Sequence, residues 1–303
     1  MALQLAFLGM GGIGRAMSKN LALQGNLKAP IIIWNRTLAR AIDHSNQVGS
    51  NALVAESIQE AVFKSDIIWS SLGSQEAVLQ CFDTILKENV KGKLFVECST
   101  ITPEVTDDLS QRVIEAGAEF VAMPVFGEPS MANAALLTCL PAGPAEPVKR
   151  VLPFLMGVVC RAVIDLSGEP PGTASHLKLV GNVLILQMIE SVAEAHVLAE
   201  KTNLAAKHVH SMISSVFPGP FAIYSNRMTS GNYCAPEPLI AIGMIKEVAD
   251  HVNNLAKQSG TELGAYKIAC RHVDMAKKHA GVAGDVAGIY GAVRVESGLS
   301  FEN

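Results

Sequence analysis

Residues 3–14 read LQLAFLGMGGIG, an apolar run from Leu3 to Leu8 followed by a cluster of glycines. The apolar run predicts a buried strand, and the amphipathic stretch from Ile13 to about Leu23 predicts a helix. A glycine-rich turn between a strand and a helix is typical of domains that bind a dinucleotide. We therefore expect the chain to begin with a nucleotide-binding strand-turn-helix unit.

The turn has the spacing G-x-G-x-x-G. Its first glycine permits the tight turn, the second lets the backbone approach a pyrophosphate, and the third lets helix and strand pack closely. The pyrophosphate would lie on the amides at the helix N-terminus. A glycine-rich connection without a ligand is the alternative. The candidate cofactor contacts are Gly9, Met10, Gly11, Gly12, Ile13 and Gly14.

Short apolar runs alternate with helical stretches through the rest of the first half. Such alternation indicates a parallel sheet covered by helices on both faces, as in a doubly wound α/β domain of the Rossmann type. One helix start is marked by Thr102 as cap and Pro103 at the first helical position. Further strands are predicted at Pro30–Trp34, Asp66–Ser70, Leu94–Glu97, Glu119–Ala122, Ala135–Leu140 and Val158–Leu166, and another helix is predicted from Thr37.

The chain changes character at a cluster of proline and glycine, residues 167–172 (SGEPPG). We place the domain boundary there, with a Rossmann-type domain at 1–167 and an all-helical domain at 168–303. Thr173–Asn203 predicts one long interdomain helix of about 30 residues. Its apolar surface favours a homodimer through the helical domain. Further helices are predicted at Ala205–Ser215, Leu239–Ser259 and Thr261–His279, with residues 217–220 as a loop.

Composition excludes several classes of protein. The 303 residues carry 24 basic and 28 acidic side chains, so no basic footprint for nucleic acid is present. No apolar run approaches the ~18 residues of a membrane span, and the first basic residue, Arg15, leaves no secretory signal. The six cysteines form no C-x-x-C pair, so we expect reduced thiols, no metal site and a cytoplasmic protein.

The residues that distinguish NAD from NADP are expected at the end of the second strand, here Asn35-Arg36-Thr37. NAD-binding domains usually carry a carboxylate there for the ribose hydroxyls. Arg36 can instead bind a 2′-phosphate through charge-assisted hydrogen bonds, and Thr37 can add a hydroxyl. We expect Asn35 to cap the following helix. These residues predict NADP, with a solvated surface charge as the alternative for Arg36.

Five patches in the correct order resemble the β-hydroxyacid dehydrogenases, relatives of the imine reductases and of 6-phosphogluconate dehydrogenase. The first is residues 7–21, which include the glycine turn. The others are Cys98 to Pro103 (CSTITP), Ala122 to Gly127 (AMPVFG), Gly172 through Lys178 to Asn182, and Lys246-Glu247. The resemblance implies a Rossmann-type domain, a helical domain on a long helix, and an active site between them.

The resemblance places the catalytic lysine on Lys178, with Asn182 one turn later on the same face of the helix. Hydride transfer to a carbonyl needs a proton donor, which an ammonium supplies. We expect burial and the helix N-terminus to lower the pKa of Lys178. The resemblance also implies cofactor contacts at Leu72, Thr100 and Lys246. Their alternatives are ordinary surface or packing roles.

The chain departs from the family after Pro124-Val125. Phe126-Gly127-Glu128 stands where carboxylate-reducing members have a serine and two glycines, and Ala122 replaces an acid. Phe126 donates no hydrogen bond, and Glu128 would repel an anion if it pointed inward. We therefore assign Phe126, Gly127 and Asn182 to substrate binding and expect a bulkier, less carboxylate-dependent substrate. Backbone amides at Gly127 that still bind a carboxylate are the alternative.

Three functions remain open. The first is an NADP-dependent dehydrogenase or reductase that acts on a small alcohol or carbonyl substrate, with Lys178 as general acid and base. The second is an imine reductase with an uncharged substrate, which Phe126 favours and Lys178 disfavours, since those relatives commonly replace the lysine. The third is a non-catalytic dinucleotide-binding scaffold, a class that tends to lack the lysine.

Overall fold

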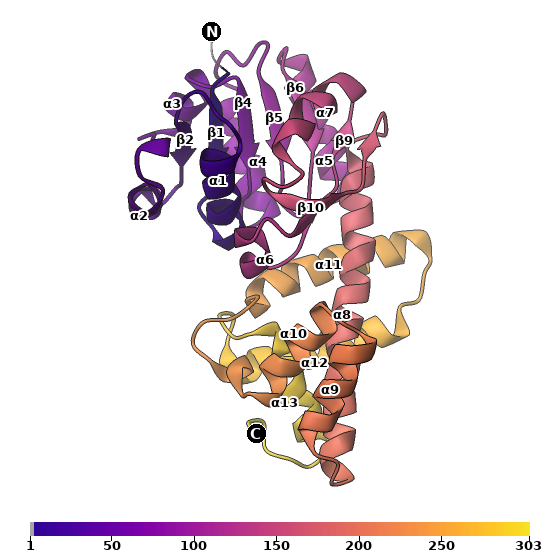
Figure 1. The fold of residues 1–303 in the computed structure, drawn as a ribbon. Helices are drawn as coiled ribbons and strands as arrows, with labels where there is room; N and C mark the ends of the chain where they lie inside the picture. Colours follow the sequence, from indigo (N-terminus) through magenta and orange to yellow (C-terminus); the bar gives the residue numbers. More distant parts are fainter. Residues whose placement is uncertain (1–2) are drawn as a thin grey trace. The chain divides into compact units, whose positions relative to one another are not determined.

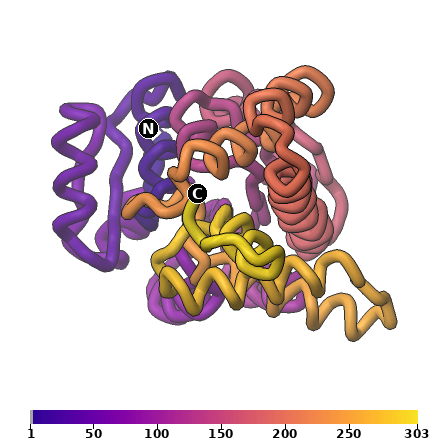
Figure 2. Tube along the Cα trace, turned by 90° about the horizontal axis from the view of Figure 1, so that it is seen from below, coloured from indigo at the N-terminus to yellow at the C-terminus, as the bar shows by residue number. Residues whose placement is uncertain are grey.

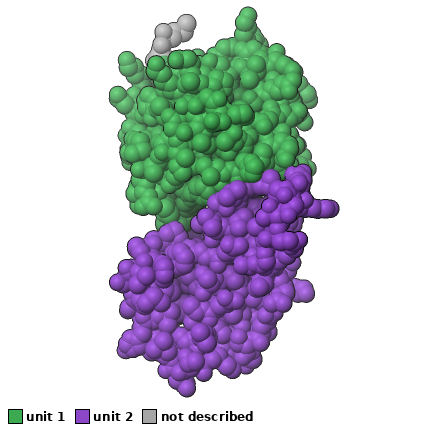
Figure 3. Space-filling model, turned by 90° about the vertical axis from the view of Figure 1, so that its right-hand side faces the viewer, with its two compact units in different colours: residues 1–178 green, residues 179–303 purple. Residues whose placement is uncertain are grey.

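The computed structural model describes residues 3–303, which divide into two compact units. One unit ends at Lys178 and the other runs from Leu179 to Asn303 (Figure 3). The division falls within helix α8 (Gly172–Lys201). The domain boundary inferred at residue 167 stays a prediction.

An eight-stranded sheet forms the centre of the first unit (Figure 1). Its strands pair in parallel except for the antiparallel pair β6–β9, so the predicted parallel sheet is confirmed for most of its width. Its order is β11 (Leu166–Ser167), β9 (Ala142–Gly143), β6 (Glu119–Ala122), β5 (Leu94–Glu97), β4 (Ile67–Ser70), β1 (Leu5–Leu8), β2 (Ile31–Trp34) and β3 (Ala52–Val54).

A second, three-stranded sheet contains β10 (Cys160–Val163), β8 (Leu137–Cys139) and β7 (Val125–Phe126), in that order. The single strand predicted over Val158–Leu166 is therefore wrong, because this stretch supplies β10 to one sheet and β11 to the other. Between them Asp165 accepts a hydrogen bond from the amide of Ser167 at 2.9 Å. Such a local bond competes with a continuous strand ladder.

The sheet is packed on both faces, and the two faces follow the alternation of side chains along each strand. Phe7 and Trp69 belong to the cluster that packs against α1 and α2, whereas Ile68 and Phe95 belong to the cluster with α3, α4 and α5. The helices are α1 (Gly12–Gln24), α2 (Leu38–Val48), α3 (Ile58–Phe63), α4 (Gln75–Ile85), α5 (Pro103–Glu115), α6 (Pro129–Asn133) and α7 (Ala145–Val151).

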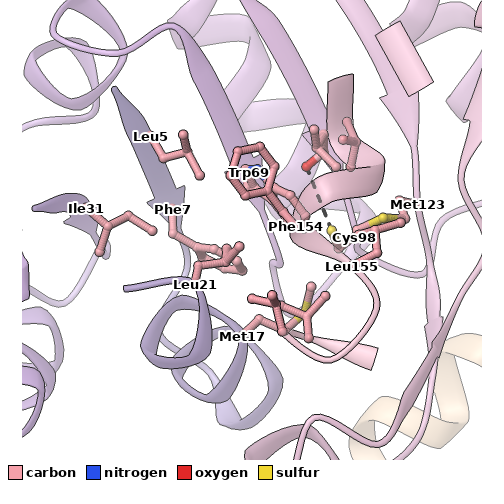
Figure 4. Close-up of a cluster of buried hydrophobic side chains, with 14 of the residues drawn as sticks. Leu5, Phe7, Met17, Leu21, Ile31, Trp69, Cys98, Met123, Phe154 and Leu155 are labelled. Carbon is pink, nitrogen blue, oxygen red and sulfur yellow. Dashed lines mark hydrogen bonds between the residues drawn. The ribbon is translucent and has the colours of Figure 1, made fainter. Parts of the chain in front are cut away.

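The first cluster is centred on Trp69, which is fully buried (Figure 4). Its ring stacks on Phe7 with centroids 6.4 Å apart and meets Phe154 edge-on at 6.5 Å. Each such aromatic pair contributes about 0.5–1.5 kcal/mol beyond the burial of apolar area.

The predicted cap of α5 is also confirmed: Thr102 accepts from the amide of Val105 at 3.4 Å, with Pro103 following.

The second unit contains the rest of α8 and five further helices, and its described residues form no named strand. The predicted helices are present, but residue 220 does not belong to a loop, because Pro220 begins α10. Helices α12 and α13 pack side by side (Figure 2). The bounds are α9 (Ala206–Val216), α10 (Pro220–Thr229), α11 (Ile242–Ser259), α12 (Gly264–Ala280) and α13 (Ile289–Glu296).

Helix α8 is long and apolar. Among the described residues it is the one helix that could cross a membrane by length and composition, with a mean hydropathy of 1.2 over an 18-residue window. Half of that window is buried inside the structure. The core helix of a globular protein gives the same signal, so this is weak evidence for a span.

Candidate active site

The glycine turn connects β1 to α1 in a conformation that only glycine adopts without strain. Gly9 has a φ of +99°, and a Cβ there would lie 2.2 Å from the carbonyl oxygen of Ser71. A Cβ on Gly14 would lie 2.0 Å from the carbonyl oxygen of Gly9. A Cβ on Gly11, by contrast, would meet nothing within 4 Å. Gly9 and Gly14 thus allow close packing, whereas Gly11 leaves its backbone open to the approach of a ligand.

The N-terminus of α1 fits an anionic group. Its N-cap residue, Gly11, makes no side-chain capping bond, and no acidic residue stands in the first turn. The first amides of a helix lack intrahelical partners and carry a partial positive charge. The open face at Gly11 and these amides together form the kind of site that holds a dinucleotide pyrophosphate.

The end of β2 is tied to this turn by Asn35. Its Oδ1 accepts from the amide of Met10 at 2.9 Å, and its Nδ2 donates to the carbonyl of Thr37 at 2.9 Å. The expectation that Asn35 caps the next helix is therefore wrong, because the N-cap of α2 is Thr37, without a side-chain capping bond. Arg36 is exposed, and within residues 3–303 no hydrogen bond or ion pair holds its guanidinium.

The loops after β4 and β5 are joined by a buried carboxyl that sequence reasoning missed. Glu97, 2% exposed, accepts from the Ser70 hydroxyl and, at 2.6 Å, from the Ser99 amide. The Ser99 hydroxyl in turn accepts from the amide of Leu72 at 2.8 Å. Burial raises the pKa of Glu97 to about 7, against the opposing effect of these hydrogen bonds. The predicted contacts Leu72 and Thr100 lie on the two loops that this network connects.

Lys178 lies against the short strand β7. Its Nζ donates to the carbonyl oxygen of Val125 at 2.8 Å and lies 4.2 Å from the centroid of the Phe126 ring. Burial lowers the pKa of Lys178 to about 8, in the predicted direction. The structure therefore brings together two of the residues that the sequence singled out, Lys178 and Phe126.

The first turns of α8 are anchored to α5, which fixes the position of Lys178. The amide of Gly172 donates to Oδ1 of Asp107 at 2.7 Å, and the hydroxyls of Ser175 and Thr106 are 2.7 Å apart. A carboxylate at the N-terminus of a helix is favoured by the helix dipole. No signal in the sequence pairs Asp107 with Gly172, because the two residues are 65 positions apart.

Glu128 is turned onto its own helix. It is 8% exposed, and its carboxylate accepts from the amides of Ser130 at 2.7 Å and Met131 at 3.0 Å and from the Ser130 hydroxyl. It is thus the N-cap of α6, with Pro129 following. Proline at the first helical position is a helix-start signal that the sequence offers here. Gly127, with a φ of +134°, makes the turn between β7 and this cap.

Helix α6 also joins the substrate candidates to the cofactor candidates. A Cβ on Gly12 of the glycine turn would lie 3.0 Å from Cγ of Pro129. Asn20 on α1 donates to the carbonyl of Ala132 at 2.8 Å. The segment that contains Phe126, Gly127 and Glu128 is therefore attached to the helix whose N-terminus fits the phosphates.

The remaining two candidates lie in the second unit. Asn182 follows Lys178 by one turn on α8, where residues four apart share a face. Lys246 on α11 pairs with Asp274 on α12 at 3.0 Å, and the side-chain hydrogen bond to Asp274 raises the pKa of Lys246. Their roles toward substrate and cofactor stay predictions. Within residues 3–303 no group of three or more His, Cys, Asp or Glu side chains could hold a metal ion.

Comparison with known proteins gives matches along nearly the whole chain. The NAD binding domain of 6-phosphogluconate dehydrogenase matches residues 4–164. The NADH-dependent oxidoreductase ucdB of Aspergillus ustus is 41% identical over 95% of this chain and 98% of its own length. The probable 3-hydroxyisobutyrate dehydrogenase of Mycobacterium tuberculosis is 29% identical, over 73% of this chain and 72% of its own.

Solved structures show the same fold. The structure of Psf3 in complex with NADP⁺ and 2-OPP has a TM-score of 0.83 at 20% identity, and covers 94% of this chain and 98% of that chain. The M. tuberculosis 3-hydroxyisobutyrate dehydrogenase with L-serine has a TM-score of 0.80 at 21% identity, with 97% and 100% covered. The family match, the 41% identical relative and the site geometry agree: this chain is an oxidoreductase that belongs to the β-hydroxyacid dehydrogenase family.

Proposed function

We propose that this protein transfers hydride between NADP(H) and a small alcohol or carbonyl substrate, with Lys178 as general acid and base. The observation that carries the proposal is a half-buried lysine held by β7, on a domain whose glycine turn fits a dinucleotide. A bound dihydronicotinamide supplies the hydride. The chain itself supplies the fixed backbone for the phosphates and a proton at the substrate oxygen.

The ionisation of Lys178 supports the role of proton donor. With a pKa lowered by burial to about 8, the ammonium predominates at neutral pH, yet its proton leaves more readily than that of an exposed lysine. In reduction the ammonium gives its proton to the carbonyl oxygen. In oxidation the neutral amine takes the proton of the hydroxyl. Asn182, one turn along α8, would orient the lysine or the substrate oxygen.

The preference for NADP rests on Arg36. Its exposed guanidinium follows β2, and we assign it and Thr37 to the 2′-phosphate, with Asn35 holding the turn. The Aspergillus relative is named an NADH-dependent enzyme, whereas the Psf3 structure contains NADP⁺. A comparison of initial rates with NADPH and NADH decides which of the two cofactors this protein prefers. Faster reaction with NADPH supports the assignment, and a preference for NADH contradicts it.

The residues that follow Val125 favour an uncharged carbonyl as substrate. The amides of Ser130 and Met131, which could bind an anion, are taken by Glu128, and Phe126 offers a ring face instead of a donor. The same features favour an imine as a second candidate, with Lys178 donating to nitrogen. We further propose that α8 helps to form a homodimer, since Val180, Leu184 and Leu198 are exposed along it.

A substrate panel tests this proposal. It pairs small semialdehyde carboxylates with uncharged aldehydes, ketones and cyclic imines, and follows the absorbance of the reduced nicotinamide. We expect turnover of uncharged carbonyls with NADPH. Turnover of imines alone would favour the second candidate. Efficient turnover of the carboxylates would contradict the substrate class, and no turnover of any member would favour a non-catalytic scaffold.

A further inference from the structure

Two consecutive residues of β7 hold the ammonium of Lys178. The carbonyl of Val125 accepts a hydrogen bond from it at 2.8 Å, and the ring of Phe126 lies with its centroid 4.2 Å from the nitrogen. That distance is within the range in which a cation is attracted by the negative face of an aromatic ring. We propose that Phe126 is a positioning residue that keeps Lys178 in the ammonium form.

The ring has this role because no carboxylate of the described chain pairs with the ammonium of Lys178. No carboxylate of the described chain lies within the 4.0 Å ion-pair distance of Lys178 Nζ, and burial alone disfavours the charged form. The acids on the neighbouring segments are engaged elsewhere. Glu128 is bound by the first amides of α6, and Asp107 accepts from the amide of Gly172. His176, two residues earlier on α8, is exposed.

The ammonium and the neutral amine of Lys178 differ in how strongly they interact with β7. The carbonyl of Val125 can accept a hydrogen bond from either an ammonium or a neutral amine. The ring face, however, attracts the cation far more strongly than it attracts the amine. The aromatic ring therefore raises the affinity of Lys178 for its proton, whereas burial reduces it. The ring thus opposes the effect of burial and keeps more of the lysine in the ammonium form at neutral pH.

This inference rests on the proposed function and adds a positioning residue to it. The Nζ proton would pass to the carbonyl oxygen while the carbonyl carbon receives the hydride that a reduced nicotinamide would supply, which leaves an alcohol and a neutral amine. Solvent then returns a proton to the amine. A ring that favours the ammonium keeps populated, at neutral pH, the form of Lys178 from which reduction begins.

The test separates the ring's π-face from its bulk. Phe126→Leu keeps an apolar side chain over the lysine but removes the aromatic face, and Phe126→Tyr keeps the face. The pKa of Lys178 is measured without cofactor, by competitive acetylation with acetic anhydride across a pH series and mass spectrometry of the peptide. Phe126→Leu should lower this pKa by about 0.5–1.5, and Phe126→Tyr should match the wild type.

An unchanged or raised pKa in Phe126→Leu would overturn the proposal. If that variant does not fold, as judged by circular dichroism, Phe126→Met replaces it. The pH profile of carbonyl reduction is recorded on the same variants. If acetylation shows the lower pKa but the alkaline limb of the rate profile does not move with it, the positioning role is supported and the acid-base role of Lys178 is refuted.

Discussion

Replacing Glu97 by glutamine should change the pH dependence of stability in a defined way. Glu97 is 2% exposed, and its carboxyl binds the Ser99 amide at 2.6 Å and the Ser70 hydroxyl. Glutamine has nearly the same shape, can keep both contacts if the serine hydroxyl reverses, and has no proton to lose. The substitution therefore removes the ionisation of a buried group and little else.

The magnitude follows from the pKa of this carboxyl. Burial raises it from 4.5 to about 7, which corresponds to roughly 3 kcal/mol in the free energy of unfolding. Since the folded state holds the proton more tightly, this contribution is fully present below pH 4.5 and is lost as the pH rises through about 7. Between pH 5 and pH 8 the wild type should lose about 2.5 kcal/mol that Glu97→Gln keeps.

The two tryptophans make the assay selective. Trp34 and Trp69 both lie in the first unit, on β2 and β4, so their fluorescence reports the unfolding of that unit. Urea unfolding of wild type and Glu97→Gln is compared at the two pH values, with the exposed Glu88→Gln as control. If Glu97→Gln and the wild type show parallel pH dependence, Glu97 is not an ionising buried group and the reasoning is wrong.

Three further predictions concern cofactor, substrate and the second unit. Arg36→Ala should reduce the ratio of kcat/KM for NADPH over NADH by roughly 10- to 150-fold, and an unchanged ratio would remove Arg36 from the site. Phe126→Ser combined with Glu128→Gly should lower KM for semialdehyde carboxylates by about tenfold or more, because the α6 amides become free. An unchanged KM would show that these amides bind no anion. The hydrogen bond to Glu190 raises the pKa of His272 above 6.5, so the stability this pair contributes is present below pH 6.5 and lost as the pH rises through the folded pKa. The difference in Tm between wild type and His272→Gln should therefore shrink from pH 6 to pH 9, and a constant difference would contradict it.

Much of the fold could be predicted because its signals are local. The apolar runs gave β5 and β6 with their observed bounds, and the Thr102-Pro103 pair gave the start of α5. The glycine turn could be recognised from its spacing alone, although the group that Gly9 must avoid, the carbonyl of Ser71, is distant in the sequence. The absence of proline from residues 173–203 predicted α8 to within two residues at each end.

What the sequence did not show depends on contacts between distant residues. The side chain of Asn35 accepts a hydrogen bond from the amide of Met10, 25 positions away, instead of capping the helix that follows it. The network around Glu97 joins two loops 27 positions apart, and nothing in the letters ECS marks it. Asp107 pairs with Gly172 across 65 positions. The cap formed by Glu128 was also missed, although its partners follow directly after Pro129.

We propose that Lys178 performs acid-base chemistry on a domain that binds the dinucleotide independently of this residue. The most direct measurement compares wild type with Lys178→Met in two assays, NADPH binding by fluorescence titration and the rate of carbonyl reduction. We predict an unchanged Kd for NADPH and a loss of about 10²–10⁴-fold in kcat. Turnover that survives in Lys178→Met, with the cofactor bound, would show that Lys178 is not the general acid and base.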